Sequence, residues 1–371
     1  MIKKTAFYAI MLLVVISVPI ALVTGFFVYR KLTFSYDYCE PYGQIDSVIG
    51  WTLKPSVASC LSLKNHITGN VFFDTKIYTN TAGFRDQDPS ALAPKDAVVL
   101  IGDSFTFGYG VDYQQSFPYF LSEDLKIPTI NMGVPGYGSG STYELFSKHQ
   151  KTLRPKAVVY FTLGLWTRSI CSLQQVDDTL VPCFIFDEQG SPQLRTPRPS
   201  AVSVAASKYQ YPGGYLTSGY KFRDMLFILK PMELWHGLQS HIGLLLGKIG
   251  FARVEDRAGE LLRQDQVKKI LAYELNLYKN SFVDEDTVFL LFDPRNYYAQ
   301  SLDEIKKALG ARFIYLGSEA WDAEVFSQFK DLPEKDVKVP GDGHWAEGAN
   351  RLIAKSMAKR LVEAGVQEHR R

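Results

Sequence analysis

Ser104 stands where the sequence provides both a reactive group and a turn to present it. It lies in "AVVLIGDSFTFGYGV", residues 97–111, where a β-branched run breaks into a glycine-flanked Asp-Ser pair. A residue at the carboxyl end of a parallel strand lies at the edge where open α/β sheets bind ligands. The Ser104 backbone N–H would also face a developing oxyanion there. Because a serine hydroxyl alone is a weak nucleophile, Ser104 needs a base from elsewhere in the chain.

His344 is the candidate base among the six histidines of the chain. It lies in "VPGDGHWAEGANRLIA", a glycine-bounded loop before the last predicted helix, two residues after Asp342. That spacing lets a carboxylate hold the Nδ1 side of the ring while Nε2 faces the serine. We expect surface or packing roles for the remaining histidines, which are His66, His149, His236, His241 and His369.

Three familiar glycine motifs do not fit these stretches. A P-loop needs four residues between its glycines and then a lysine, but Gly102 and Gly108 are separated by five residues without one. The glycines within 136–140 are spaced G-x-G-x-G, which is not the dinucleotide fingerprint. A nucleophile elbow needs glycine two residues after the serine, where Thr106 stands. Ser104 therefore requires a different scaffold.

Short apolar runs alternate with helical patterns from residue 97 onward, which is typical of a parallel sheet because each crossover between parallel strands needs a helix. The predicted strands are residues 97–102, 128–133, 156–164, 287–293 and 312–317. The predicted helices are residues 116–125, 141–153, 264–282, 301–310 and 346–365. This pattern predicts an α/β domain.

The chain divides into regions of different composition. We expect a membrane anchor at residues 1–31, a β-rich lead-in at 32–95, the α/β domain at 96–364 and a charged tail at 365–371. The alternation is interrupted at about 172–262, where we expect an insertion that contains a hairpin and an amphipathic helix.

The N-terminal run carries no charge between Lys4 and Arg30. As a helix it would reach roughly 37 Å, which exceeds the hydrocarbon thickness of about 30 Å. It is longer than a signal-peptide core, so we expect an uncleaved anchor. The basic residues on its two sides nearly balance, and the cysteines favour a topology with the bulk of the chain on the periplasmic, extracytoplasmic side. The formal net charge is only +2, so the chain lacks the large excess of basic residues that is typical of nucleic-acid-binding proteins.

The four cysteines are placed as two local pairs. Cys39 and Cys60 flank one segment, and Cys171 and Cys183 flank another, which favours two bridges in an oxidising compartment. Four cysteines allow three pairings, and free buried thiols are the alternative. None of the four has the spacing of a metal site.

The strings "GDSFTFGYGV", "NMGVPGYGSGS" and "DGHWAEGANRLIA" resemble, in this order, three blocks of the SGNH/GDSL hydrolase superfamily. With a "TNTAGFRD" string before the first strand, the chain is similar to envelope-anchored bacterial members such as periplasmic polysaccharide O-acetyltransferases and esterases. The similarity covers about residues 75–171 and 264–364. It implies a flavodoxin-like three-layer α/β/α fold and a triad of Ser104, His344 and Asp342.

The resemblance also implies roles around the triad. The N–H groups of Ser104 and Gly136 would be the oxyanion donors, with Gly133 as the alternative for the second. Asp103 would hold the turn as a structural partner. Arg85 in "AGFRD" is expected to brace the fold by pairing with a nearby carboxylate.

Two departures from the family pattern concern the site. Where relatives carry a Gly-x-Asn-Asp block with an oxyanion-binding asparagine, this chain reads "FTLGLWTRSI", so Trp166 or Thr167 would have to donate instead. Arg168 is a candidate contact for a substrate carboxylate or phosphate. The acid and base are spaced Asp-x-His, whereas many relatives have Asp-x-x-His. Trp166 and Trp345 are able to stack on a sugar, although packing is the favoured interpretation for both.

These observations predict a serine-dependent hydrolase or acyl (acetyl) transferase acting on an envelope carbohydrate. The alternative is an inactive saccharide-binding or scaffold protein of the same fold, which the missing asparagine would explain. The expected partners are an ester-bearing small molecule or polysaccharide, and the membrane through the N-terminal helix. No metal or organic cofactor is implied, and no protein partner is indicated.

Overall fold

The computed structural model describes residues 34–65, 67–162, 181–196, 264–282 and 286–367, together with residues 11, 17, 25 and 169. Most of the predicted anchor, most of the predicted insertion and the end of the predicted tail lie outside these residues. Within them, no helix combines the length and the apolar character needed to cross a bilayer.

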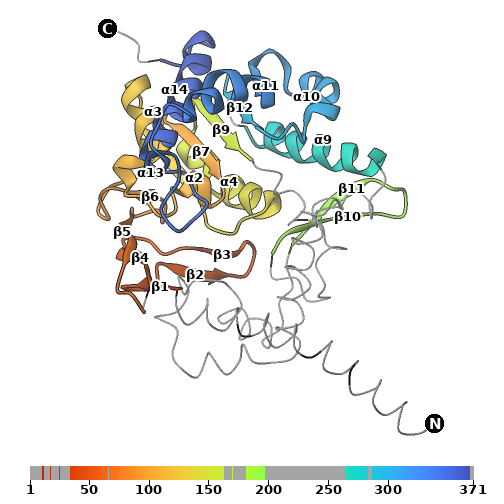
Figure 1. The fold of residues 1–371 in the computed structure, drawn as a ribbon. Coiled ribbons are helices and arrows are strands. Elements are labelled where there is room, and N and C mark those ends of the chain that lie inside the picture. The colour runs from red at the N-terminus through yellow and green to blue at the C-terminus, as the bar shows by residue number, and fades with distance from the viewer. Residues whose placement is uncertain are drawn as a thin grey trace, which may run out of the picture.

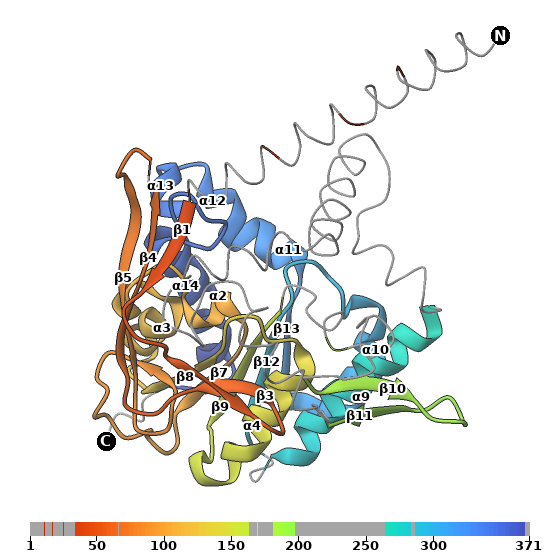
Figure 2. The same cartoon turned by 90° about the horizontal axis from the view of Figure 1, so that it is seen from below.

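One mixed sheet runs through the described part of the chain in the order β1-β4-β5-β6-β8-β7-β9-β12-β13 (Figure 1; β8 and β13 are labelled in Figure 2). Strands β8, β7, β9, β12 and β13 are parallel and, counted along the chain, follow the doubly wound order 2-1-3-4-5. This order confirms the predicted flavodoxin-like sheet. The strands are β1 (Phe34–Tyr38), β4 (Ala58–Asn65), β5 (Val71–Thr79), β6 (Arg85–Asp86), β7 (Val98–Gly102), β8 (Thr129–Gly133), β9 (Ala157–Phe161), β12 (Val288–Phe292) and β13 (Phe313–Leu316).

Helices cover both faces of the parallel strands, because successive strand residues point to opposite sides and both sides are apolar. In β7, Val99 and Ile101 join the core under α4 (Ser139–Leu153) and α9 (Gln264–Ser281). Val98 and Leu100 join the core under α3 (Phe117–Leu125) and α14 (Glu347–Glu363). The result is the predicted three-layer α/β/α arrangement (Figure 2).

The predicted lead-in is β-rich, and four of its strands extend the sheet in antiparallel fashion. The junction is the pairing of Arg85 in β6 with Asn131 in β8. A separate hairpin of β2 (Gly43–Asp46) and β3 (Gly50–Leu53) packs into the same core as the sheet. The predicted disulfide between Cys39 and Cys60 is confirmed, with 5.0 Å between the Cα atoms.

The described part of the insertion contains the predicted hairpin, formed by β10 (Cys183–Phe186) and β11 (Pro192–Arg195). Cys183 is disulfide-bonded, whereas its predicted partner Cys171 lies outside the described residues.

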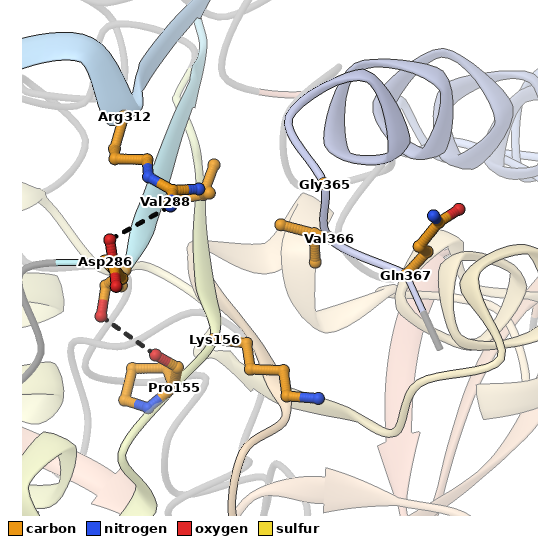
Figure 3. Close-up of a pocket in the computed structure, with 9 residues that line it drawn as sticks. Pro155, Lys156, Asp286, Val288, Arg312, Gly365, Val366 and Gln367 are labelled. Carbon is orange, nitrogen blue, oxygen red and sulfur yellow. Dashed lines mark hydrogen bonds and ion pairs between the residues drawn. The ribbon is translucent and has the colours of Figure 1, made fainter. Parts of the chain in front are cut away.

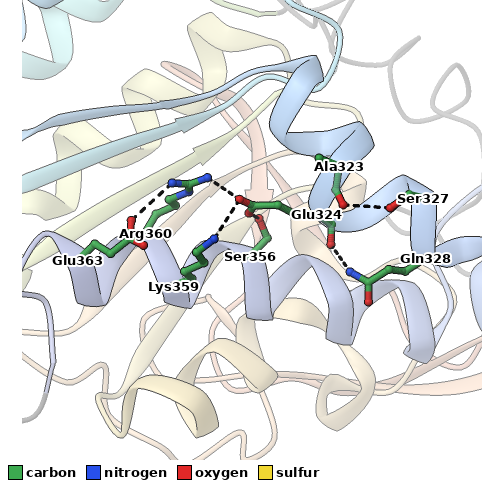
Figure 4. A network of polar contacts seen from close by, with 8 residues as sticks. All are labelled: Ala323, Glu324, Ser327, Gln328, Ser356, Lys359, Arg360 and Glu363. Atoms are coloured by element: carbon green, nitrogen blue, oxygen red, sulfur yellow. Dashed lines mark hydrogen bonds and ion pairs between the residues drawn. The ribbon is translucent and has the colours of Figure 1, made fainter.

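Between β13 and α14 the chain forms short helical segments, including a π-turn at Asp322–Phe326. Glu324 in this turn fastens it to α14: it accepts a hydrogen bond from Ser356 at 2.7 Å and pairs with Lys359 and Arg360 (Figure 4). Further α-helices are α2 (Ser104–Phe107), α10 (Leu302–Leu309), α11 (Ser318–Trp321), α12 (Ser327–Phe329) and α13 (Glu334–Val337).

Candidate active site

The tight turn after β7 presents Ser104 at the carboxyl edge of the sheet. Gly102 has φ +152°, and a Cβ at this position would lie 2.8 Å from the Phe161 carbonyl oxygen, so only glycine fits without a shift. Asp103 then caps α2, because its carboxylate accepts the Phe105 N–H at 3.0 Å. Asp103 therefore has the structural role expected of it, and Ser104 is the first residue of the helix.

A second tight turn, just before α14, presents His344 and Asp342. The His344 carbonyl accepts the Val339 N–H at 2.9 Å, and the Asp342 N–H donates to the Val339 carbonyl at 3.0 Å. Gly341, with φ +73°, makes this turn possible. The Asp342 carboxylate therefore reaches the His344 ring although the two residues are only two positions apart in the chain.

The structure brings Ser104, His344 and Asp342 together. His344 Nε2 lies 2.7 Å from Ser104 Oγ, and its Nδ1 is in direct contact with Asp342 Oδ1. The same carboxylate oxygen accepts the His344 backbone N–H at 2.9 Å. Two contacts to one oxygen fix both the position and the tautomer of the imidazole, so Nε2 is left as the acceptor for the serine proton.

Aromatic rings enclose this imidazole. The rings of Phe105 and Tyr109 lie 4.6 and 4.9 Å from the His344 ring, centroid to centroid. The next residue, Trp345, packs against Phe161 at 5.0 Å and stacks on Trp321 at 5.5 Å. Packing is therefore the role of Trp345, as the sequence favoured.

Ser104 lies beside the point where the order of the parallel strands reverses. Strand β7 pairs with β8 on one side and with β9 on the other, which is the switch point where open α/β sheets bind ligands. The loop after β9 carries Trp166, Thr167 and Arg168, which lie outside the described residues. Their predicted roles stay predictions.

The two glycines considered for the oxyanion site differ in their hydrogen bonding. The Gly133 N–H donates to Asn131 Oδ1 at 3.0 Å, and a Cβ at Gly133 would lie 2.3 Å from Phe107 N. This amide is therefore already used inside the fold. Gly136, with φ +85°, and Ser104 have no acceptor for their N–H groups among the described residues. The Gly133 amide is thus engaged inside the fold whereas the Gly136 amide is not engaged by any described residue, and the role of Gly136 as the second donor stays a prediction.

The lead-in supports both loops that complete the site, a role that sequence reasoning missed. Trp51 Nε1 donates to the Pro135 carbonyl at 3.2 Å, and the Tyr137 hydroxyl donates to the Trp51 carbonyl, so the β2–β3 hairpin holds the loop that carries Gly136. On the other side, a Cβ at Gly341 would lie 3.0 Å from Phe72 Cγ. No local pattern reveals these contacts, because each joins segments far apart in the chain.

The predicted pairing of Arg85 with a carboxylate is wrong. The buried guanidinium instead donates to backbone carbonyls, namely those of Phe107 at 2.7 Å, Val111 at 2.5 Å and Gly108. The loop after α2 turns its carbonyl oxygens inward, and a planar fork of donors satisfies several of them at once. Desolvation lowers the pKa of Arg85 to about 10, so the side chain stays charged at neutral pH.

Glu274 of α9 is a second group that sequence reasoning missed. It is fully buried and accepts hydrogen bonds from the hydroxyls of Tyr160 at 2.9 Å and Tyr298 at 2.8 Å. Burial raises its pKa to about 7, against the opposing effect of these hydrogen bonds. Tyr160 lies in β9, the strand that pairs with β7, so this carboxyl is buried against the strand next to the one that ends at Ser104.

The histidines other than His344 are expected to have surface or packing roles, and no metal site is expected. His149 packs edge-on against Phe84, with 5.0 Å between ring centroids, which confirms its packing role. His66, His236, His241 and His369 lie outside the described residues. In the described ranges, no three His, Cys, Asp or Glu side chains are grouped to hold a metal.

A pocket of about 180 Å³ lies at the opposite edge of the sheet, near the amino ends of β9 and β12 (Figure 3). Lys156 and Arg312 line it, and Arg312 pairs with Asp286 at 3.1 Å. None of the predicted site residues borders this pocket.

A serine, an imidazole and a carboxylate hydrogen-bonded in this order at a switch point have the arrangement used for acyl transfer. No family model and no curated protein sequence matches the chain. Among solved structures, it is similar to an acetyl xylan esterase from the rumen bacterium Butyrivibrio proteoclasticus, with a TM-score of 0.37 and 9% identity over 76% of this chain and 68% of that chain.

Two further solved structures are similar at the same level. A carbohydrate esterase family 2 enzyme with a carbohydrate-binding domain, from Corynascus thermopiles (Myceliophthora fergusii), has a TM-score of 0.36 and 13% identity over 90% of this chain and 87% of that chain. A protein assigned to the G-D-S-L family of lipolytic proteins, from Desulfitobacterium hafniense DCB-2, has a TM-score of 0.29 and 14% identity over 71% of this chain and 99% of that chain. At these scores the strand order remains the evidence for the fold.

Proposed function

We propose that this chain is a serine-dependent ester hydrolase with Ser104 as nucleophile, His344 as general base and Asp342 as the group that orients the base. The observation that carries the proposal is the 2.7 Å contact between Ser104 Oγ and His344 Nε2, with Asp342 on the far side of the same ring. A hydroxyl placed against an oriented imidazole is an activated nucleophile.

The first half of the reaction forms an acyl-enzyme. His344 Nε2 takes the Ser104 proton as Oγ attacks the acyl carbon, and the Asp342 carboxylate stabilises the imidazolium that results. The N–H groups of Ser104 and Gly136 donate to the oxyanion. When the tetrahedral intermediate collapses, His344 returns the proton to the departing alcohol.

The second half of the reaction releases the acyl group. His344 takes a proton from an incoming hydroxyl, which attacks the acyl carbon, and the Ser104 oxygen leaves with that proton. Water as acceptor makes the chain a hydrolase, and a sugar hydroxyl makes it an acyltransferase. Both reactions use the same residues and differ only in which hydroxyl reaches the acyl-enzyme.

The substrate we propose is an acylated, and in particular acetylated, carbohydrate of the cell envelope. The resemblance of the three motif blocks supports this class, and Trp166, Thr167 and Arg168 are the proposed substrate contacts. We also propose that residues 1–31 anchor the domain outside the cytoplasm. The Cys39–Cys60 disulfide supports that placement, because disulfides persist in oxidising compartments.

Hydrolysis of p-nitrophenyl acetate by the detergent-solubilised full chain tests the proposal. Ser104→Ala should lose p-nitrophenol release and labelling by a fluorophosphonate probe, because both need an activated serine. Ser90→Ala, at an exposed serine whose hydroxyl donates to Asp88, is the matched control and should retain both. Equal slow hydrolysis by the two variants would contradict the proposal and favour the inactive saccharide-binding alternative.

A further inference from the structure

The chain enters the sheet beside the turn between β4 and β5. Phe34, the first residue of β1, pairs with Asn65, the last residue of β4. Val71 begins β5 and pairs with Lys64. The start of β1 and the β4–β5 turn therefore lie at the same end of the sheet.

The tip of this hairpin, residues 67–71, exposes two aliphatic side chains. Ile67 is 62% exposed and Val71 is 53% exposed. The sequence "NHITGNVFF" contains no charged side chain apart from His66 when it is protonated. Asn65 holds the turn rigid, because its Oδ1 accepts the N–H groups of Ile67 at 2.9 Å and Thr68 at 3.0 Å. The aliphatic side chains are thus presented outward by a fixed turn.

Chain length limits how far this tip can lie from the proposed anchor. The uncharged run ends at Tyr29, and Arg30 and Lys31 follow it as groups suited to lipid headgroups. Three Cα steps separate Lys31 from Phe34, so the two lie at most about 11 Å apart. The headgroup layer on each side of a bilayer is roughly 5–8 Å thick. With Lys31 at the headgroups, the start of β1 lies no more than about 11 Å from that layer, and the hairpin tip is at the same end of the sheet.

We infer that Ile67 and Val71 insert into the lipid headgroup region and hold the domain against the bilayer. The inference rests on the proposed anchor, and it assigns the exposed tip to a lipid surface. Two aliphatic side chains give only a weak contact on their own, but the tether makes the contact intramolecular and raises its effective concentration. The absence of fixed charge on the tip suits an apolar boundary.

Docking at this tip would set the height of the site above the membrane. The hairpin that carries the tip also contacts the His344 loop, since Phe72 and Leu63 lie against Gly341. The hairpin therefore links its exposed tip to the loop that carries His344 through direct packing contacts. The ester that reaches Ser104 would then belong to a substrate held close to the membrane surface.

Lipid quenching of a bimane label tests this inference on the full chain in nanodiscs of phosphatidylethanolamine and phosphatidylglycerol. The label is placed by Ile67→Cys and, as a control, by Leu92→Cys, because Leu92 is 80% exposed on a different loop. Doxyl-labelled lipid should quench the label at residue 67 by about twofold or more relative to residue 92. A label at 67 in the Val71→Ser background should be quenched less.

The possible outcomes distinguish a failure of the docking inference from a failure of the proposed membrane anchor. Equal quenching at the two positions in a protein that co-elutes with nanodiscs would overturn the docking inference and leave the anchor standing. Failure to co-elute would overturn both. Protection of residue 67 that rises with protein concentration in detergent alone would assign the tip to a second copy of the chain and overturn the lipid assignment. None of these outcomes depends on esterase activity.

Discussion

Ser104 Oγ lies 2.7 Å from His344 Nε2, although 240 residues separate the two in the chain. Strand β7 brings the serine to the carboxyl edge of the sheet, and the turn before α14 brings the histidine to the same edge. Asp342 holds the other nitrogen of the ring, so the pair depends on a third side chain for its orientation.

Asp342→Asn should therefore slow the reaction without unfolding the site. The amide oxygen can still accept the His344 backbone N–H, but the side chain no longer stabilises the imidazolium and no longer imposes the tautomer. We expect kcat for p-nitrophenyl acetate to fall by about 10²–10⁴-fold, with little change in KM. Asp331→Asn, at an exposed aspartate before α13, is the control and should keep the wild-type kcat. A fall of less than fivefold in Asp342→Asn would argue against the proposed role.

Gly102→Ala should disturb the turn that presents Ser104. The added methyl would lie 2.8 Å from the Phe161 carbonyl oxygen and within 2.3 Å of Thr106 Oγ1, in a backbone conformation that alanine rarely adopts. We expect a loss of about 2–4 kcal/mol in the free energy of unfolding, with a fall in kcat at temperatures where the variant stays folded. Urea denaturation and ester hydrolysis measure the two effects.

Gly190→Ala is the matched control for that substitution. Gly190 also has a positive φ, of +74°, but a Cβ there meets nothing within 4 Å, and the residue lies in the β10–β11 turn. Only the backbone strain remains, so we expect a loss of about 1 kcal/mol and an unchanged kcat. If both variants lost the same stability, the steric argument for Gly102 would be wrong.

Much of the fold could be predicted because its signals are local. Five-residue apolar strands, helical periodicity and two glycine turns each reveal themselves in a short window, and the motif blocks pointed to Ser104, Asp342 and His344 together. The order of the strands came only from the resemblance, because alternation alone does not say which strands are neighbours.

The supporting contacts could not be predicted, for a physical reason. Glu274 sits in an amphipathic helix with several other charged residues, and only the hydroxyls of Tyr160 and Tyr298, from two other segments, distinguish it. Likewise, Phe72 packs against Gly341 although the two residues are far apart in the sequence. Arg85 was expected to find a carboxylate, but the carbonyls that it meets depend on how a distant loop turns.

Glu324→Gln should loosen the π-turn from α14. Burial opposes the charge of Glu324, but the Ser356 hydrogen bond and the nearby Arg360 and Lys359 outweigh it and lower the pKa of the carboxyl. A lowered pKa contributes stability that is present above the unfolded value and lost as pH falls through the folded one. Because solvent screens part of this network, we expect the substitution to cost only about 1 kcal/mol at pH 7, and progressively less as pH falls below the unfolded value of 4.5.

Urea denaturation at pH 7 and pH 4 checks this, with Glu363→Gln as the matched control. Glu363 meets the same Arg360, at 3.5 Å, but its side chain is 55% exposed, so solvent screens the pair. We expect a cost below about 0.5 kcal/mol for this control. Equal costs in the two variants would mean that the network shown in Figure 4 adds nothing beyond a surface ion pair.

Glu274 should give stability a pH dependence of the opposite sign. Burial raises its folded pKa to about 7, while the unfolded carboxyl titrates near its ordinary value of 4.5. Between these values the unfolded chain binds fewer protons than the native one, so stability is lost as pH rises through this window. Glu274→Gln cannot ionise. The free energy of unfolding of the wild type minus that of the variant should therefore fall by about 2–3 kcal/mol from pH 5 to pH 8. Urea titrations of both proteins at the two pH values measure it, and a difference that stays constant would show that Glu274 keeps one charge state throughout.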